Sequence, residues 1–391
     1  MVASDAFKGS LTSLEVADAV RAGLLDVAPD AVVTVLPVAD GGEGTVTAAV
    51  AAGWAPVTTA VHGPTGAAVV ATLAVRAATG DGRSAARPTV VVELADACGL
   101  GRLPDGIPAP LTASSRGLGE ALRAALDLGP GAVLVGVGGS ASTDGGAGML
   151  AALGARLLDA SGNDLPDGGA ALEGLARLDL RGLDPRLATT ELFLAADVDN
   201  PLLGPAGAAA VYGPQKGATP ADVERLEAAL SHWADVVASA RLDPAGTPPP
   251  SHHSLPAQRP GAGAAGGVGF ALLAVLGAQR RSGVDVVLDL VGLDAALGGA
   301  DLVVTGEGSL DDQTLAGKAV AGVARRAAAH GIPVVAVCGR LVLDAKGLTA
   351  LGLQAAYPLS QLEPDASRSL AHAPELLRHT GRRIAREWLS G

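Results

Sequence analysis

The pattern of apolar and polar positions divides this chain into short apolar runs and longer Ala- and Leu-rich segments, which alternate along the sequence. The short runs have the length and the valine content of buried strands, and the longer segments have the spacing of amphipathic helices. Strands and helices that alternate in this way predict an α/β fold with parallel sheets. The clearest predicted strands are residues 31–36, 133–137, 192–196, 302–305 and 334–337.

The first helix is predicted by a local signal as well as by its apolar spacing. Thr12 and Glu15 have the separation of a capping box, in which each side chain accepts a hydrogen bond from the backbone N–H of the other residue. Val16, Val20 and Leu24 follow at the spacing of one helix face. We therefore expect a helix that begins just after Thr12, with these three residues as its apolar stripe.

Polar, glycine-rich loops follow the predicted strands. In an open α/β sheet, ligands bind at the carboxyl ends of the strands. We therefore expect the functional residues of this chain in these loops. The loops are residues 37–44, 138–146, 197–200, 306–313 and 338–340.

Composition limits the classes of protein to be considered. A length of 391 residues exceeds what one compact core usually supports, so two domains are expected. The net charge of −12 argues against binding to nucleic acid or to an anionic membrane, and no apolar run reaches membrane-spanning length. Cys98 and Cys338 lie in apolar surroundings far apart in sequence, which is typical of buried thiols in a cytoplasmic protein.

The lysines of this chain are few and unevenly distributed. Only four of the 28 cationic residues are lysines, and three of these, Lys8, Lys216 and Lys318, lie in glycine-rich loops. Lys346 has the surroundings of an ordinary surface residue. Arginine supplies the other positive charges, and lysine binds phosphate as a compact point charge. The pattern favours phosphate chemistry, with chance placement in loops as the alternative.

The loop after residues 133–137 is a candidate anion site. Small residues and hydroxyl groups between a strand and a helix allow the backbone to close on a phosphate or a carboxylate. A plain strand-to-helix turn rarely needs so many glycines and hydroxyl groups. The candidate residues are Gly138, Gly139, Ser140, Ser142, Thr143 and Asp144.

Carboxylates occur in the loops that follow the other strands. Asp40 and Glu43 stand on either side of Gly41 and Gly42, in a glycine turn suited to binding hydroxyl groups or a hydrated Mg²⁺. Helix capping is the alternative role for this turn.

Asp197 and Asp199 follow the predicted strand 192–196. Alternate residues at the end of a strand would project to opposite sides, so that only one of the two carboxylates is expected to face a site. Asp197 is the preferred candidate.

The densest polar cluster follows residues 302–305. Glu307 and Asp311 could both point into one cleft because glycines flank Glu307, and they are candidate Mg²⁺ ligands. Gln313 and Lys318 lie in the same cluster and are candidate substrate-binding residues.

Residues 261–266 match the G-x-G-x-x-G pattern of dinucleotide-binding folds. They follow a Pro-rich stretch rather than a strand, so the dinucleotide interpretation fails, and no Walker A sequence occurs either. Gly263 and Gly266 then belong either to a helix start near an anion or to a place where helices pack closely.

The motifs together resemble the bacterial glycerate kinases, over essentially the whole chain and in the same order. The resemblance rests on seven segments, residues 4–10, 39–44, 138–146, 197–201, 213–217, 260–267 and 305–314.

The resemblance implies ATP- and Mg²⁺-dependent phosphorylation of D-glycerate, in this family usually at the 2-hydroxyl to give 2-phosphoglycerate. It also implies two α/β domains with the active site in the cleft between them. One is a Rossmann-like, parallel-sheet domain from both chain ends (1–62 and 286–391), and the other is a large inserted domain (63–285). Small-molecule substrates are the expected partners, and monomer and homodimer remain open.

Two positions depart from the family pattern. Relatives usually carry three or four apolar residues before the first Asp loop, whereas only Met1, Val2 and Ala3 precede Ser4 here, so a short first strand is expected. The family also tends to have proline where this chain has Val320, a change that should be tolerated at the start of a helix.

Roles follow from the chemistry of the residue types. Asp197 would accept the proton of the glycerate 2-hydroxyl or hold Mg²⁺. Lys8 and Lys216 would neutralise the glycerate carboxylate and the migrating phosphoryl group, and Asp5 joins the substrate-binding candidates through its motif. Glu307 and Asp311 would hold Mg²⁺.

Three questions remain open from the sequence. It does not decide which loop binds ATP and which binds glycerate. A glycerate 3-kinase or a kinase of another small hydroxy acid are alternatives within the same class. A non-catalytic sensor of nucleotides or hydroxy acids is an alternative of a different class, disfavoured because the acidic loop residues are all present.

Overall fold

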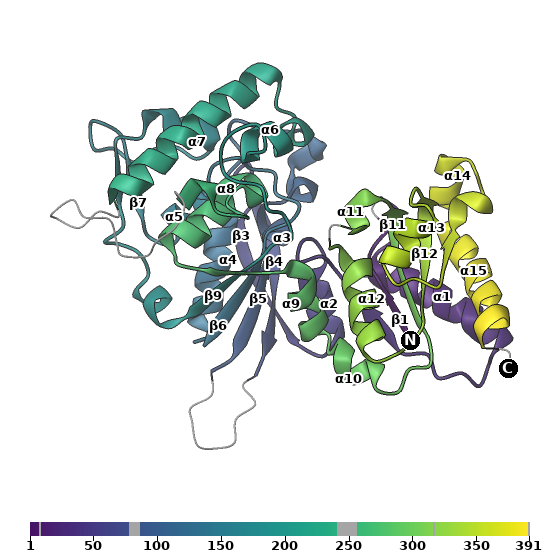
Figure 1. Cartoon of the computed structure of the whole chain (residues 1–391). Helices are drawn as coiled ribbons and strands as arrows, with labels where there is room; N and C mark the ends of the chain where they lie inside the picture. The colour runs from purple at the N-terminus through teal and green to yellow at the C-terminus, as the bar shows by residue number, and fades with distance from the viewer. Residues whose placement is uncertain (8, 78–86, 241–255, 316, 390–391) are drawn as a thin grey trace. The chain divides into compact units, whose positions relative to one another are not determined.

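The computed structural model describes residues 1–7, 9–77, 87–240, 256–315 and 317–389 (Figure 1). The chain divides into two compact units. The first combines the two chain ends, Met1–Gly53 and Gly283–Gly391, and the second is the continuous segment Trp54–Ser282. Both units contain a sheet and helices, which confirms a two-domain α/β fold.

The first unit is built on a five-stranded parallel sheet with the order β13-β12-β11-β1-β2. Its short β1 is nevertheless an interior strand, since it pairs with β11 on one side and β2 on the other. The strands are β1 (Val2–Ser4), β2 (Val35–Pro37), β11 (Val303–Leu310), β12 (Val334–Leu341) and β13 (Ala355–Pro358).

Helices cover both faces of this sheet. Successive side chains on a strand point to opposite sides, so neighbouring residues of β11 belong to different apolar cores. Val304 of β11 belongs to a core shared with α1 (Ser13–Val27) and α15 (Ala373–Trp388). The preceding residue, Val303, belongs to a second core shared with α9 (Gly283–Leu290) and α12 (Ala319–Ala329). The expected Rossmann-like layering is therefore present. The shorter helices are α2 (Thr45–Ala51), α10 (Leu293–Leu297), α11 (Asp312–Leu315), α13 (Ala345–Ala350), η8 (Leu359–Gln361) and α14 (Ala366–Ala371).

The second unit contains a six-stranded sheet with the order β10-β9-β6-β5-β4-β3. The strands from β10 to β5 are parallel, and β4 and β3 continue the sheet as antiparallel strands. A separate two-stranded ribbon consists of β7 (Arg156–Leu158) and β8 (Arg177–Asp179). The six strands are β3 (Ala55–His62), β4 (Ala68–Arg76), β5 (Thr89–Glu93), β6 (Ala132–Gly136), β9 (Glu191–Ala195) and β10 (Gln279–Arg281).

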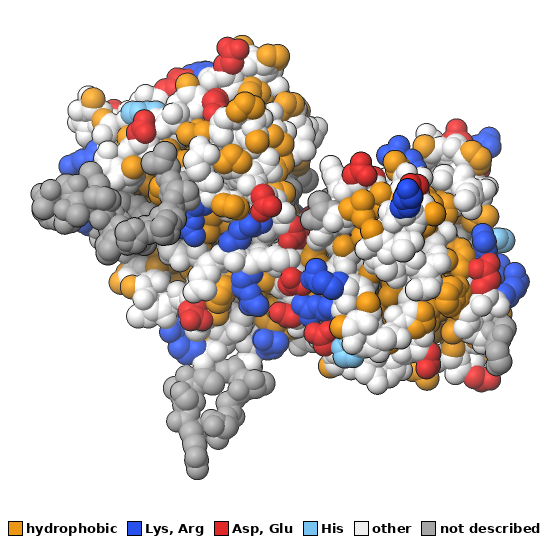
Figure 2. All heavy atoms as spheres, viewed as in Figure 1, with side chains coloured by type: hydrophobic (Ala, Val, Ile, Leu, Met, Phe, Trp, Pro, Cys, Tyr) orange, Lys and Arg blue, Asp and Glu red, His pale blue; other side chains and the backbone are white. Residues whose placement is uncertain are grey.

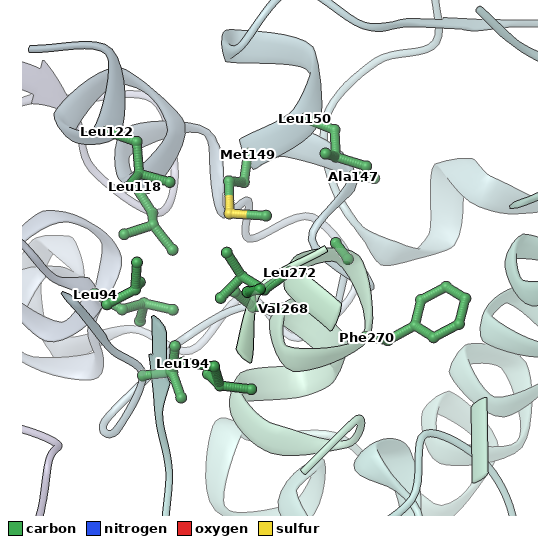
Figure 3. Close-up of a cluster of buried hydrophobic side chains, with 14 of the residues drawn as sticks. Leu94, Leu118, Leu122, Ala147, Met149, Leu150, Leu194, Val268, Phe270 and Leu272 are labelled. Carbon is green, nitrogen blue, oxygen red and sulfur yellow. The ribbon is translucent and has the colours of Figure 1, made fainter. Parts of the chain in front are cut away.

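One large apolar cluster forms most of the core of the second unit, and Leu103, Ala113 and Ala141 form a smaller separate one. Figure 3 shows part of the large cluster, where Leu118 and Met149 from two helices meet Leu194 of β9 and Val268. The helices are α3 (Leu94–Cys98), α4 (Arg116–Asp127), α5 (Ala147–Ala152), α6 (Ala208–Tyr212), α7 (Pro220–Ala240), α8 (Ala264–Phe270) and the π-helix η7 (Ala271–Val275). The 3₁₀ turns are η1 (Leu100–Arg102), η2 (Pro104–Gly106), η3 (Gly169–Gly174), η4 (Pro185–Thr189), η5 (Pro214–Lys216) and η6 (Pro256–Gln258).

The prediction of the first helix is confirmed in detail. Thr12 is the N-cap of α1, and both hydrogen bonds of the capping box with Glu15 are present. Val16, Val20 and Leu24 are all buried. Val320 likewise lies in the first turn of α12 and is buried, so valine is accommodated at this helix start.

The prediction of a buried strand over residues 31–36 is wrong for residues 31–34, and Val35 and Leu36 are only half-buried. Strand β2 begins only at Val35, and the Val32 side chain is 94% exposed. The strand is short because it lies at the edge of the sheet and pairs only with β1, which has three residues.

The prediction of loops after residues 305 and 337 is also wrong, for residues 306–310 of the first loop and for all of residues 338–340. Strands β11 and β12 continue as far as Leu310 and Leu341, since they pair with each other there. Residues 306–310 therefore alternate between the two faces of a strand instead of forming a glycine loop.

Residues 55–62 form β3 of the second unit's sheet, whereas the sequence prediction assigned them to the first domain.

No helix in the described ranges is long and apolar enough to cross a membrane.

Several of the described arginines pair with carboxylates at the surface. Arg378 and Arg382 both contact Asp26, and Arg225 pairs with Glu173. Figure 2 shows acidic and basic side chains interspersed on the visible face. This use of arginine agrees with the inference that the lysines in loops have a different role.

Candidate functional site

The candidate residues of the first unit lie where three neighbouring parallel strands end. Asp5 follows β1, Asp40 follows β2, and Glu307 is on β11, which pairs with β1. The backbone N–H of Asp5 donates to Gly306 O at 2.9 Å. Because β2 lies on one side of β1 and β11 on the other, these residues stand at the topological switch point, where open α/β sheets bind ligands.

Glu307 is the centre of a polar cluster. Its buried carboxylate accepts a hydrogen bond from the Thr314 hydroxyl, and Lys318 Nζ lies 3.8 Å from Glu307 Oε2. Burial raises the pKa of Glu307, Thr314 and Lys318 oppose the rise, and the charges of Asp311 and Asp40 add to it. A further cation beside this group would stabilise the ionised carboxylate.

Two hydroxyl groups on β11 were missed by sequence reasoning. Thr305 Oγ1 and Ser309 Oγ are buried, and neither has a hydrogen-bond partner among the described residues. Thr305 and Ser309 each lie two residues from Glu307 on β11, so the three side chains are on the same face of the strand. Leaving a buried hydroxyl unpaired costs about 1–3 kcal/mol, so these oxygens fit a site for a ligand or ordered water. The two-residue spacing around Glu307 would have revealed them, had residues 306–310 been predicted as strand.

Asp311 and Gln313 surround the start of α11. The Gln313 backbone N–H donates to Asp311 Oδ1 at 3.0 Å, and the Asp311 N–H donates to Thr314 Oγ1 at 3.1 Å. Gln313 is exposed and Asp311 is half-buried. The turn thus connects Asp311 to Glu307 through their shared partner, Thr314.

The Asp40 turn has a strict need for glycine at one position. Gly41 has φ +82°, and a Cβ there would overlap the backbone of Gly283. The Gly42 N–H donates to Asp40 Oδ1 at 3.2 Å, which orients that carboxylate. Glu43 is exposed. The charge of Asp40 contributes to the raised pKa of Glu307.

In the second unit, the loop from Gly138 to Gly146 joins β6 to α5. Gly138 is half-buried and Gly139 is exposed, whereas every residue from Ser140 to Gly146 is buried. Ser142 Oγ and Thr143 Oγ1 are buried and have no hydrogen-bond partner in the part of the chain that the structure describes. These two hydroxyl groups therefore fit a bound anionic oxygen or a water.

Asp144 is enclosed by hydrogen-bond donors of its own unit. Its carboxylate accepts from the backbone N–H and the hydroxyl of Ser115, both at 2.8 Å, and from the N–H groups of Gly146 and Gly148, both at 3.2 Å. Burial raises the pKa of Asp144, and these hydrogen bonds oppose the rise. The carboxylate connects the starts of α4 and α5, and Ser115 is a further residue that sequence reasoning missed.

Lys216 is buried, contrary to what a loop lysine suggests. Only 2% of the residue is exposed, and its Nζ donates to Ser140 Oγ at 2.7 Å and to Ser142 O at 2.5 Å. Burial lowers the pKa of Lys216 to about 7, against the opposing charge of Asp144. In this structure Lys216 contacts the 138–146 loop.

The Gly-rich segment 261–267, which includes the first residues of α8, packs closely against the loops at Pro201 and Ser142 rather than against another helix. A Cβ on Gly263 would overlap Pro201 O, and one on Gly266 would overlap Ser142 O. Ala265, Gly266 and Gly267 have φ of 53°, 66° and 92°, a run of left-handed residues that costs energy at alanine. The Gly266 carbonyl accepts from the Gly145 N–H at 2.9 Å, so this turn lies against the 138–146 loop.

Asp197 follows β9, the neighbour of β6 in the sheet, and is half-buried. Asp199 forms an ion pair with Arg280 at 2.7 Å, and its side chain is 79% exposed. The two carboxylates thus differ in surroundings, in line with the preference for Asp197.

Lys8 lies outside the described residues. Within them, no group of three or more His, Cys, Asp or Glu side chains is arranged to hold a metal ion. Mg²⁺ in nucleotide enzymes is typically held by one or two carboxylates together with phosphate oxygens and water. The carboxylates of Glu307 and Asp311, beside the unpaired hydroxyls of β11, fit this mode of binding.

The geometry defines a class of protein. Hydroxyl groups, ammonium groups and carboxylates gather at the carboxyl ends of parallel strands, in a form that suits phosphoryl transfer by positioning and charge neutralisation. A profile of the glycerate kinase family matches residues 1–389. The chain therefore belongs to the glycerate kinase family. It is a kinase, and this class implies ATP as its phosphate donor.

Similar proteins cover nearly the whole chain. A glycerate kinase of Bacillus subtilis is 42% identical over 386 residues, which are 98% of this chain and 96% of the relative. A glycerate 2-kinase of Escherichia coli K12 is 41% identical, covering 91% of this chain and 89% of the relative. A crystal structure described as that of a glycerate kinase 2 from Salmonella typhimurium LT2 has 44% identity and a TM-score of 0.78, covering 100% of this chain and 98% of that one.

Proposed function

We propose that this chain phosphorylates D-glycerate at its 2-hydroxyl, with ATP as donor and Mg²⁺ as cofactor. The observation that carries the proposal is family membership over residues 1–389, together with a relative of 41% identity that is a glycerate 2-kinase. The buried polar groups in both units support it, since phosphoryl transfer requires groups that are held in place before the reaction.

In the proposed reaction, the 2-hydroxyl oxygen of glycerate bonds to the γ-phosphorus of ATP. The bond from that phosphorus to the bridging oxygen breaks, and ADP leaves. The hydroxyl proton passes to a base, for which Asp197 is the candidate, with Mg²⁺ binding as its alternative role. Lys8 remains the candidate cation for the glycerate carboxylate or the migrating phosphoryl group.

Glu307 and Asp311 would hold the Mg²⁺, with Asp40, Gln313 and Lys318 beside them. The cation would neutralise charge on the phosphate oxygens. The carboxylates carry out two tasks without it: Glu307 keeps Lys318 within 3.8 Å, and Asp311 holds the turn at the start of α11.

We also propose a cytoplasmic location. Cys98 and Cys338 are both free and buried, and burial raises the pKa of each thiol to about 12. Unpaired, unreactive thiols suit a reducing compartment.

The test is turnover of D-glycerate with ATP and Mg²⁺, with the product identified by ³¹P NMR. A 2-phosphoglycerate signal that disappears without Mg²⁺ is expected, and Asp197→Ala should lower the rate by about 100-fold or more if Asp197 is the base. Asp199→Ala is the matched control, because Asp199 is exposed and paired with Arg280.

A 3-phosphoglycerate signal would overturn the assigned hydroxyl and retain the kinase. A folded protein that phosphorylates only another hydroxy acid would overturn the substrate. Binding of ATP without any turnover would favour the sensor.

A further inference from the structure

We propose that Lys216 is a positioning residue: it holds residues 140–143 through Ser140 and Ser142, so that the Ser142 and Thr143 hydroxyls can bind an anionic oxygen of the substrate. The inference rests on the proposed kinase function and specifies what the second unit contributes to it. It replaces the expectation that Lys216 itself contacts the phosphoryl group.

The ammonium group of Lys216 is enclosed by the protein. An ammonium group has three N–H donors, and two of those on Lys216 go to Ser140 Oγ and Ser142 O. The residue is almost fully buried. Through these two hydrogen bonds, the enclosed ammonium group holds the loop that contains Ser140 and Ser142.

The ammonium group of Lys216 also lies beside the left-handed turn at residues 265–267. A Cβ on Gly266 would lie 2.9 Å from Lys216 Nζ, so the lysine stands between the left-handed turn at 265–267 and the loop. Strained backbone of this kind persists only where its surroundings hold it in place. The hydrogen bond from Gly145 to Gly266 connects this turn to the 138–146 loop, and the hydrogen bonds from Lys216 hold the facing residues Ser140 and Ser142.

Asp144 lies at the other end of residues 140–144. Asp144 is held by Ser115, Gly146 and Gly148, so a buried charge holds each end of residues 140–144. Between these ends lie Ser142 Oγ and Thr143 Oγ1, both buried and without a partner in the described ranges. Polar groups kept rigid and unpaired are prepared for a ligand, since they need no reorganisation when it binds.

The test compares Lys216→Met, Ser140→Ala and the double variant. Methionine keeps much of the length of lysine and removes the charge. We expect kcat/KM to fall about 100-fold in Lys216→Met, as for a misplaced site, and about 10-fold in Ser140→Ala, as for one lost hydrogen bond. The double variant should resemble Lys216→Met alone, since both act on one segment. Multiplying effects would overturn the proposal. Lys346→Met, an exposed lysine, is the control.

The pH profile separates positioning from plain structural support. Asp144, on the loop, carries the charge that acts on Lys216 near neutral pH, and burial lowers the pKa of Lys216 to about 7. The thiol of Cys98, at the end of α3, is the other titratable group near Lys216, and it stays protonated in this range because burial raises its pKa. As pH rises through the pKa of Lys216, the ammonium loses its charge, so kcat/KM should fall on the alkaline side of neutrality. Lys216→Met should lack this decrease; its persistence in that variant would assign it to another group.

A measurement independent of turnover completes the test. Hydrogen exchange of backbone amides in residues 138–146 should accelerate in Lys216→Met and Ser140→Ala and stay unchanged in Lys346→Met. Unchanged exchange in both loop variants would overturn the inference even in an active enzyme. Faster exchange in a protein that does not phosphorylate glycerate would retain the positioning role and reject the proposed function. Should Lys216→Met not fold, Ser140→Ala alone decides.

Discussion

Single residues in the second unit show how steric fit and backbone conformation act separately. Gly266 and Gly277 have nearly the same backbone angle, φ +66° and +70°. A Cβ on Gly266 would overlap Ser142 O, whereas a Cβ on Gly277 would meet no atom within 4 Å. The first position therefore combines a conformational demand with close packing, and the second has the conformational demand alone.

Gly266→Ala should cost more stability than Gly277→Ala. Left-handed backbone at alanine costs about 1–2 kcal/mol, which is the loss in the free energy of unfolding expected for Gly277→Ala. Gly266→Ala should lose about 1–3 kcal/mol more, since the backbone of the 138–146 loop has to move. Urea unfolding of both variants measures the difference. Equal losses would show that the loop accommodates the methyl group without cost.

The lysines give a second example of what single residues contribute. Their placement in glycine-rich loops indicated phosphate chemistry, and family membership agrees with it. Nothing in the sequence around Lys216 indicated that its ammonium group is enclosed, because the groups that enclose it, Ser140 and Ser142, lie more than 70 residues earlier.

Secondary-structure elements were predictable where the signal is local. The capping box at Thr12 sets the start of α1, and both of its hydrogen bonds form within four consecutive residues. The ends of β2 and β11 were mispredicted because they depend on partner strands. The three residues of β1 limit β2, and β12 extends β11 past Glu307.

Thr12→Ala should lower the free energy of unfolding by about 1 kcal/mol, the usual contribution of an N-cap. Thr47→Ala is the matched control, since Thr47 is an exposed residue within α2 and alanine is a better helix former there. Urea unfolding at neutral pH gives both values. A loss in Thr47→Ala equal to that in Thr12→Ala would contradict the capping argument.

At the scale of the whole molecule, each unit has cores of its own. Among the described residues, two clusters draw only on the second unit, and two others draw only on the first. Chains with separate cores commonly unfold in more than one step. The tryptophans are placed to report this, since Trp233 is fully buried in the second unit and Trp388 donates to Tyr357 Oη in the first.

Urea unfolding followed through Trp233 alone and through Trp388 alone should give midpoints that differ. The two reporters are obtained by replacing the remaining tryptophans with phenylalanine in an otherwise intact chain. Far-UV circular dichroism of each variant serves as the control for its fold. Coinciding transitions would show that the two units unfold as one cooperative system.

The α/β class, the first helix, the family and the loops that hold Asp40, Asp197 and residues 138–146 follow from the sequence alone. These depend on local periodicity and on motifs that need no distant partner. The tertiary structure decided which side chains are enclosed: Lys216 and Asp144 inside the second unit, and Thr305 and Ser309 beside Glu307 in the first. Burial and hydrogen bonding between distant segments arise only when the sheet brings those segments together, so the spacing of neighbouring residues gives at most the face of a strand on which a side chain lies.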